Sequence, residues 1–132
     1  MQFRECAGNQ HFANHAYCFM RDHAHFVVEG QSRLSDLSEL IRSWKSKTGF
    51  EYKREHGEQL WQRSFYDRVL RTEEDLVAAA IYVIENPVRA ELVGEARQYP
   101  FLGSDTMTVE EILRRGAEIR RWQSPCVRYP TV

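Results

Sequence analysis

Two histidines, His23 and His25, stand two residues apart and lead directly into the apolar run Phe26-Val27-Val28. Side chains on a β-strand alternate between its two faces, so both imidazoles and Val27 would share one face. The two histidine Cα atoms would then lie roughly 7 Å apart. This spacing allows two ring nitrogens to converge on one divalent ion with coordination positions left open for a substrate. The alternative for such a pair, taken alone, is two ordinary half-exposed histidines.

A second stretch, residues 72–87, carries two more reactive groups. The pattern predicts a helix in which Thr72 is the N-cap, acidic residues fill the first turn and Pro87 marks the end. Tyr82 and Asn86 are four residues apart, so they would project from one face of this helix. A phenol beside an amide oxygen could supply a nucleophile and a further metal ligand.

These four side chains together suit the cleavage of a phosphodiester bond. That reaction needs charge neutralised on the phosphate and a nucleophile held in line. A divalent ion on His23 and His25, with Asn86 as a weaker oxygen ligand, would polarise the phosphate. Tyr82 would attack and retain one end of the strand covalently. Because such a link is reversible, the same site could rejoin strands as well as cut them.

Length and composition indicate one globular domain: 132 residues, with 42% hydrophobic and 28% charged residues. No apolar run approaches the ~20 residues of a membrane span, and the N-terminus lacks a signal pattern, so we expect a cytoplasmic protein without membrane contact. Cys6, Cys18 and Cys126 are odd in number and irregularly spaced, which favours reduced thiols. A zinc site from Cys6, His11 and His15 is conceivable, but its spacing is not a usual structural zinc signature.

The net charge of −1 gives no general attraction to nucleic acid and argues against a non-specific DNA coat. Basic residues nevertheless gather in the middle of the chain, where a local DNA-binding surface could form; solvated helix faces are the alternative. Trp61 beside Arg63 could stack on nucleobases, or the tryptophan could close the core. The residues that we predict to contact DNA are Arg42, Lys45, Trp61, Arg63 and Arg68.

The remaining elements follow from periodicity and turn residues. We expect a β-hairpin over 15–29, a strand over 65–70 and a final helix over 108–122, whereas residues 1–14 show little pattern and the last ten look like a tail. A further helix, with Ser35 as N-cap and Gly49 just past its end, would pack its apolar stripe against the sheet. The stripe comprises Leu34, Leu37, Leu40, Ile41 and Trp44.

Four segments occur in the same order as in a known family, and together they carry a resemblance: residues 17–25, 60–67, 82–90 and 99–100. They resemble the REP-associated tyrosine transposases, which belong to the HUH single-tyrosine transposase superfamily. The resemblance implies an α+β fold, a ferredoxin-like sandwich of antiparallel sheet and helices. It also implies an enzyme that cuts and joins single-stranded DNA beside small hairpins through a 5′-phosphotyrosine, with Mg²⁺ or Mn²⁺ as cofactor.

By this resemblance His23 and His25 bind the metal, Asn86 is the third ligand and Tyr82 is the nucleophile. The implied partner is single-stranded or hairpin DNA, and a homodimer is possible, with Tyr82 acting in its own subunit or in a neighbour's. We expect residues 1–104 to form the transposase-like domain and 105–132 a C-terminal helix and tail. The alternative is a relative that binds hairpin DNA without cutting it, or a folded remnant without DNA affinity.

The sequence departs from the family pattern at several places. Arg21-Asp22 stands where the family usually reads Pro-Asn, Ala24 is smaller than the usual residue, and Glu91 replaces a common glycine. The family also places a strand and a helix before the hairpin, and only 22 residues precede His23 here. We therefore expect the usual first strand and helix to be absent. A partner subunit could supply that layer, residues 1–14 could replace part of it, or this could be a shortened copy.

Overall fold

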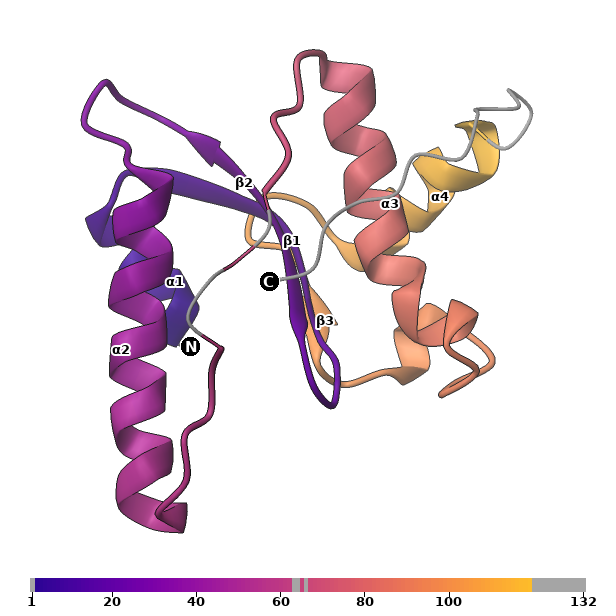
Figure 1. Ribbon diagram of the computed structural model, residues 1–132. Helices are drawn as coiled ribbons and strands as arrows, with labels where there is room; N and C mark the ends of the chain where they lie inside the picture. The colour runs from indigo at the N-terminus through magenta and orange to yellow at the C-terminus, as the bar shows by residue number, and fades with distance from the viewer. Residues whose placement is uncertain (1, 63–64, 66, 120–132) are drawn as a thin grey trace. The chain divides into compact units, whose positions relative to one another are not determined.

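A computed structural model describes residues 2–62, 65 and 67–119 of the chain. The elements in order are helix α1 (Gln2–Asn9), strands β1 (Phe12–Phe19) and β2 (Ala24–Gly30), helices α2 (Leu37–His56) and α3 (Glu73–Arg89), the short 3-10 helix η1 (Ala96–Gln98), strand β3 (Leu102–Gly103) and helix α4 (Val109–Ile119) (Figure 1). The predicted α+β class is therefore confirmed. None of the helices in the described part is long and apolar enough to cross a membrane.

The described chain forms two compact units. The first lies within Met1–Ala13 and Val28–Phe65, and the second within Asn14–Val27 and Tyr66–Val132. We call them the first unit and the second unit and describe each by itself.

The three strands form one sheet in the order β2-β1-β3. The amide of Met20 donates to the carbonyl of His23 at 2.8 Å, which closes the β1–β2 turn at Arg21 and Asp22 as predicted. The predicted hairpin over 15–29 is confirmed and extends a few residues further at its open end. On the other side of β1, the short β3 pairs antiparallel, with Tyr17 opposite Gly103.

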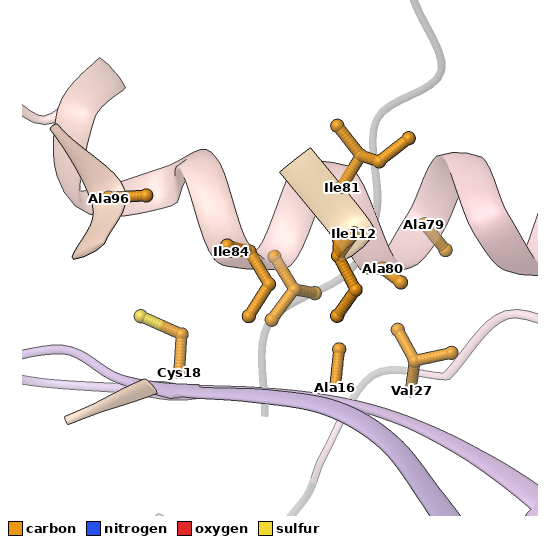
Figure 2. Packing of buried hydrophobic residues seen from close by; sticks show 10 residues of the cluster. Ala16, Cys18, Val27, Ala79, Ala80, Ile81, Ile84, Ala96 and Ile112 are labelled. Atoms are coloured by element: carbon orange, nitrogen blue, oxygen red, sulfur yellow. The ribbon is translucent and has the colours of Figure 1, made fainter. Parts of the chain in front are cut away.

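The core of the second unit is built from small and branched side chains. Ala16 and Cys18 of β1 and Val27 of β2 point toward α3, where Ala80 and Ile84 meet them (Figure 2). Because these alanines and the cysteine are small, the helix can approach the strands closely. One apolar cluster thus joins strand β2, which contains His25, to helix α3, which contains Tyr82.

Helix α4 packs on α3 within this second unit, and Ile112 is part of the same core. A Cβ at Gly116 would lie 3.1 Å from Cγ2 of Ile81, so glycine permits the close approach of the two helices. The predicted domain boundary after residue 104 stays a prediction. The predicted final helix over 108–122 is found as α4, which is described as far as Ile119. Oγ1 of Thr108 accepts a hydrogen bond from the amide of Glu111 at 3.1 Å, just before the helix begins. The predicted tail lies outside the described residues.

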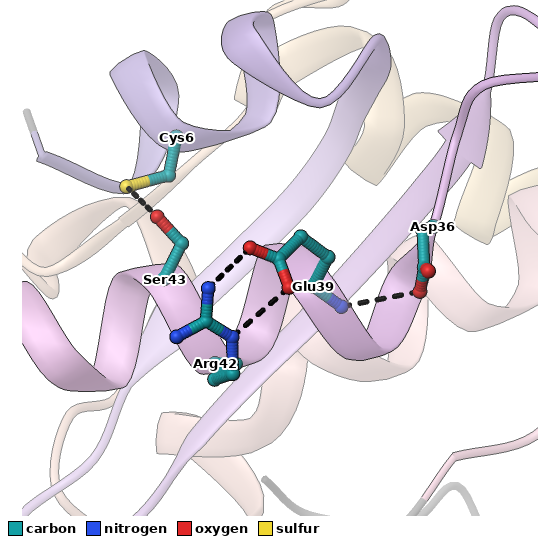
Figure 3. Close-up of polar contacts among 5 residues, drawn as sticks. All are labelled: Cys6, Asp36, Glu39, Arg42 and Ser43. Atoms are coloured by element: carbon teal, nitrogen blue, oxygen red, sulfur yellow. Dashed lines mark hydrogen bonds and ion pairs between the residues drawn. The ribbon is translucent and has the colours of Figure 1, made fainter.

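The first unit is organised around α2. Asp36 is its N-cap, since Oδ1 accepts from the amide of Glu39 at 3.1 Å (Figure 3). The helix ends at Gly57, whose φ of 73° lies in the left-handed region that favours glycine. Helix α1 packs on α2, and the ring of Phe3 meets that of Trp44 edge on with centroids 5.4 Å apart.

Both predicted ends of α2 are wrong. Ser35 bonds the carbonyl of His11 at 2.7 Å and leaves the capping position to Asp36. Gly49 lies inside the helix, where the ring of Trp61 lies 3.6 Å from the position of a Cβ. A Cβ at this distance would make an ordinary van der Waals contact, so the indole does not require glycine there, and the helix continues despite the roughly 1 kcal/mol that glycine costs.

The predicted apolar stripe is only partly buried. Leu40, Ile41 and Trp44 are buried, whereas Leu34 lies before the helix and is 75% exposed. We expected this stripe to pack against the sheet, but the ring contacts that the structure describes for it are those of Trp44 with Phe3 of α1 and with Trp61.

Helix α1 was not predicted, because residues 1–14 show no long periodicity. Only Phe3, Cys6 and Ala7 of its short span are buried, which is too few to form a repeating pattern.

The predicted strand over 65–70 is also wrong for the residues described there, namely 65 and 67–70, which have no strand pairing. Leu70 packs on the core of the second unit, whereas Val69 is exposed. The described residues of this segment therefore connect to α3, and Leu70 is the side chain among them that packs on the core.

Pro87 does not end α3, which continues to Arg89. A proline within a helix removes one N–H, the one that would reach the carbonyl of Val83 four residues back. Its own carbonyl still accepts from the amide of Leu92 at 2.9 Å. The loss of a single hydrogen bond near the end of the helix is therefore tolerated.

Candidate active site

The two histidines lie side by side on the second unit. Their ring centroids are 4.9 Å apart and the rings are nearly perpendicular, at 89°. His25 belongs to β2 and is 3% exposed, whereas His23 immediately precedes the strand and its side chain is 31% exposed. The predicted placement of both imidazoles on one face agrees with this geometry. His25 forms the rigid, buried half of the pair and His23 the accessible half.

Asp22 holds the ring of His23. Its Oδ1 lies 2.6 Å from Nδ1 of that ring. The hydrogen bond from His23, and then the charge of His23, lower the pKa of the Asp22 carboxyl. When Nδ1 donates to the carboxylate, the lone pair of the neutral imidazole resides on Nε2. This is the arrangement by which a carboxylate orients a histidine for a metal.

Tyr82 reaches this histidine pair from α3. Its ring centroid lies 6.4 Å from that of His25, with the rings at 85°. Thr72 caps the helix as predicted, since its Oγ1 accepts from the amide of Asp75 at 3.1 Å. The structure thus brings together an imidazole pair and a phenol that are far apart in the sequence, and it does so within one compact unit.

Asn86 lies one turn after Tyr82, and both are held by a residue that we did not predict. Nη2 of Arg89 donates to Oδ1 of Asn86 at 3.3 Å and also to the backbone carbonyl of Tyr82. The guanidinium carbon lies 3.8 Å from the centroid of the Tyr82 ring. The spacing of 82, 86 and 89 places the three residues on one helical face, and that spacing could have identified Arg89 from the sequence.

Arg89 and the neighbouring Cys18 are partly removed from water, and this burial shifts the pKa values of both groups. Burial lowers the pKa of Arg89, while the charge of Tyr82, a side-chain hydrogen bond with Tyr82 and the charge of Cys18 raise it. Burial raises the pKa of the Cys18 thiol to about 11, and Arg89 opposes this shift. An arginine keeps its proton under all such conditions, so the site carries a permanent positive charge beside Tyr82.

The donor types present fit a divalent metal. Two imidazole nitrogens and one amide oxygen would leave coordination positions open, and imidazole suits Mn²⁺ better than Mg²⁺, which prefers oxygen. Within the described residues no group of three or more histidine, cysteine, aspartate or glutamate side chains gathers to hold a metal. The role of Asn86 as the third ligand stays a prediction.

The same observation bears on the zinc alternative. Buried Cys6 lies with its Sγ 3.9 Å from Oγ of Ser43 (Figure 3), and Nδ1 of His15 lies 2.8 Å from Oγ1 of Thr106. In the described part of the chain these residues do not form a metal-binding group with His11.

The predicted DNA-contacting residues are divided between the units. Arg42 pairs with Glu39 at 2.9 and 2.5 Å (Figure 3), and Nζ of Lys45 donates to the carbonyl of Gln62 at 3.1 Å in the first unit. Arg68 is exposed and belongs to the second unit, as the imidazole pair does. Arg63 lies outside the described residues. Their contact with DNA stays a prediction.

Trp61, the fifth predicted contact, packs inside the first unit. Its ring centroid lies 4.6 Å from that of Trp44, and its Nε1 donates to Oγ1 of Thr48 at 2.7 Å. This packing favours the alternative in which the tryptophan closes the core, although its ring is only half-buried.

Among solved structures, the chain is similar to a REP-associated tyrosine transposase bound to a REP hairpin. The match has a TM-score of 0.68 and 19% sequence identity and covers 97% of this chain and 73% of that chain. At this identity the likeness shows the fold, and it confirms the predicted fold class. No curated protein matches the sequence.

The family assignment rests on the sequence itself. The family model described as "Transposase IS200 like" matches residues 2–82, which include the hairpin with both histidines and α3 as far as Tyr82. This span is more than half of the 132 residues. The chain therefore belongs to the IS200-like transposase family.

Proposed function

We propose that this protein binds hairpin-bearing single-stranded DNA and cuts and rejoins it through Tyr82, with a divalent metal held by His23, His25 and Asn86. The observation that carries the proposal is the edge-on approach of the Tyr82 ring to His25, 6.4 Å between centroids, beside the second imidazole.

Each side chain has a distinct part in the proposed reaction. Burial restrains the ring of His25, and the contact of Asp22 with Nδ1 of His23 leaves Nε2 of that ring available for a metal. A bound Mn²⁺ or Mg²⁺ would neutralise and polarise the scissile phosphate. The Tyr82 phenol oxygen loses its proton and forms a bond to phosphorus, while the bond from phosphorus to the 3′ oxygen breaks and that oxygen gains a proton. Attack by a 3′ hydroxyl on the phosphotyrosine reverses these changes and rejoins a strand.

The DNA partner is supported by the family and by the neighbouring structure, which is a transposase bound to a REP hairpin. Because the net charge of this chain is −1, attraction to phosphates must come from local cations such as exposed Arg68. A homodimer and a cytoplasmic location remain part of the proposal.

The proposal is tested by trapping the covalent intermediate. The protein is incubated with end-labelled hairpin single-stranded DNA and Mn²⁺, and adducts are resolved on a denaturing gel. Tyr82→Phe should form no adduct but should still bind the hairpin, and EDTA should abolish the adduct of the wild type. Tyr52→Phe is the matched control, since Tyr52 belongs to the first unit and stacks on His56. An adduct of undiminished yield in Tyr82→Phe would exclude Tyr82 as the nucleophile.

A second candidate function is hairpin binding without cleavage. The observation in its favour is the pair Arg21-Asp22, which departs from the family pattern immediately before the histidine pair. Binding would then persist in EDTA, weaken steeply with added salt and be insensitive to His23→Ala. Loss of hairpin binding in EDTA would exclude this candidate.

A further inference from the structure

Arg89 differs in its contacts from other arginines of this chain. Arg42 and Arg115 pair with the carboxylates of Glu39 and Glu111. Arg89 instead contacts an aromatic ring, a side-chain amide and a backbone carbonyl, all of which belong to Tyr82 and Asn86. A single cation thus touches both the proposed nucleophile and the proposed third ligand.

We propose that Arg89 is the positioning residue of the site, which fixes the Tyr82 phenol and the Asn86 amide together in the orientation that the reaction needs. This inference rests on the proposed function and extends it to a residue outside the ligand set and the nucleophile.

The contact with Tyr82 restrains its ring. At 3.8 Å from the centroid, the guanidinium lies well within the ~6 Å range of a cation–π interaction. The same guanidinium donates to the backbone carbonyl of Tyr82, so it is anchored to the helix that carries the ring. Rotation of the phenol away from the histidine pair would break the cation–π contact. A nucleophile restrained in this way spends more of its time in a reactive geometry.

The contact with Asn86 selects the orientation of its amide. A guanidinium has donors but no acceptor, so only Oδ1, and not the amide nitrogen, can face it. The 3.3 Å hydrogen bond therefore fixes which end of the amide is an oxygen at this position. Oδ1 has two lone pairs, and the second remains for a metal ion. Arg89 thus prepares the oxygen as a ligand and can remain bonded to it.

The positive charge of Arg89 also has a consequence for the reaction. Negative charge develops on the phenol oxygen and on the phosphate during attack, and a fixed cation beside the ring stabilises it without reorganising. Lysine would preserve the charge but not the planar group that stacks and donates at the same time. Charge and shape can therefore be separated by substitution.

The first test does not depend on activity. The protein is labelled with 3-fluorotyrosine, and the ¹⁹F resonance of Tyr82 is assigned by its absence in Tyr82→Phe. Arg89→Met should shift this resonance, Arg89→Lys should shift it less, and the Tyr52 resonance should stay in place. Arg97→Met is the matched control, because Arg97 belongs to the second unit and pairs with Glu95 at 3.9 Å. A Tyr82 resonance that does not move in Arg89→Met would overturn the proposal.

The second test measures the single-turnover rate of adduct formation at saturating hairpin DNA. Arg89→Met should lower this rate by about 10- to 100-fold, the range typical of residues that orient metal ligands, with the dissociation constant of the hairpin unchanged. Arg89→Lys should recover part of the loss. A rate loss that disappears at saturating DNA, with weakened hairpin binding, would make Arg89 a DNA contact and overturn the proposal.

The two tests separate this inference from the proposed function. If the wild type forms no adduct, the proposed function fails, and the fluorine resonance alone decides whether Arg89 positions Tyr82. If the wild type forms the adduct and Arg89→Met forms it at the same rate, the proposed function stands and the positioning role is excluded.

Discussion

The ring of His25 and the ring of Tyr82 meet edge on, with centroids 6.4 Å apart and an angle of 85° between their planes. One ring is carried by strand β2 and the other by helix α3, and the apolar cluster around Ala80 and Ile84 joins these two elements. The distance between the proposed ligand and the proposed nucleophile is therefore set by core packing. Substitutions in that core should therefore lower activity by changing the distance between the two rings, although they leave both side chains chemically unchanged.

The two histidines should respond differently to removal. His25→Ala removes a side chain that is 3% exposed, so it should abolish Mn²⁺ binding and lower the free energy of unfolding by about 2 kcal/mol. His23→Ala removes a more exposed ring and should abolish Mn²⁺ binding with little effect on stability. Calorimetric titration with Mn²⁺ and urea denaturation measure the two effects. Mn²⁺ affinity that survives either substitution would contradict a site built on the pair.

Glu91 should be replaceable by glycine with a gain in stability. Its φ of 60° lies in the left-handed region, which costs a residue with a side chain about 1–2 kcal/mol. Since glycine loses about 0.5–1 kcal/mol through the entropy of the unfolded chain, Glu91→Gly should raise the free energy of unfolding by about 0.5–1 kcal/mol. Ala90→Gly is the control, because Ala90 has a φ of −80° and should lose stability instead. Equal losses in both variants would contradict the strain at Glu91.

The burial of Cys18 predicts a loss of stability at alkaline pH. Its pKa is raised from 9.0 to about 11 by burial, so the folded protein holds the neutral thiol more strongly than the unfolded chain does. The stabilisation is complete below about pH 9 and is lost as the pH rises from 9 toward 11. Wild type should therefore lose more unfolding free energy than Cys18→Ala over this interval. Parallel pH profiles, measured by urea denaturation, would contradict the prediction.

The reactive residues could be predicted from the sequence because local patterns specify them. The alternation after His23 predicts the strand, and the N-cap at Thr72 followed by an acidic first turn predicts the helix that carries Tyr82 and Asn86. Their meeting, in contrast, was a hypothesis from the needs of phosphodiester cleavage, and the family resemblance supported it. Arg89 was overlooked because an arginine near the end of a helix is ordinary by itself, although its spacing places it on the helical face of Tyr82 and Asn86.

The parts that the sequence could not predict depend on tertiary contacts. Strand β3 has two residues, Leu102 and Gly103, which are too few for any alternation. Gly49 and Pro87 indicated helix ends by their local propensities, yet α2 continues to His56 and α3 to Arg89. Local propensity sets the boundaries of an element only where tertiary packing does not outweigh it.

Trp61 allows its packing role to be separated from base stacking. Trp61→Phe retains a ring against Trp44 but loses the 2.7 Å hydrogen bond to Thr48, so it should lower the free energy of unfolding by about 1 kcal/mol. Thr48→Val removes the same bond and leaves the indole intact, and the double variant should show that the two effects are not additive. If Trp61 also stacks on DNA, Trp61→Ala should weaken hairpin binding at a temperature where the variant is fully folded. Unchanged hairpin affinity in folded Trp61→Ala would exclude the stacking role.

Asp22 should tune the metal affinity of His23 through its charge and its hydrogen bond. The 2.6 Å contact with Nδ1 orients the ring, and the hydrogen bond and charge of His23 lower the pKa of the Asp22 carboxyl. Asp22→Asn retains an acceptor without the charge and should weaken Mn²⁺ binding only a few-fold. Asp22→Ala loses both and should weaken it by about 10- to 100-fold. Titration calorimetry in a Tyr82→Phe background measures the Mn²⁺ affinity of both variants. Because the Asp22 carboxylate is exposed, neither substitution should change the free energy of unfolding. Equal Mn²⁺ affinities in the wild type and Asp22→Ala would mean that His23 binds metal without this support, or does not bind it.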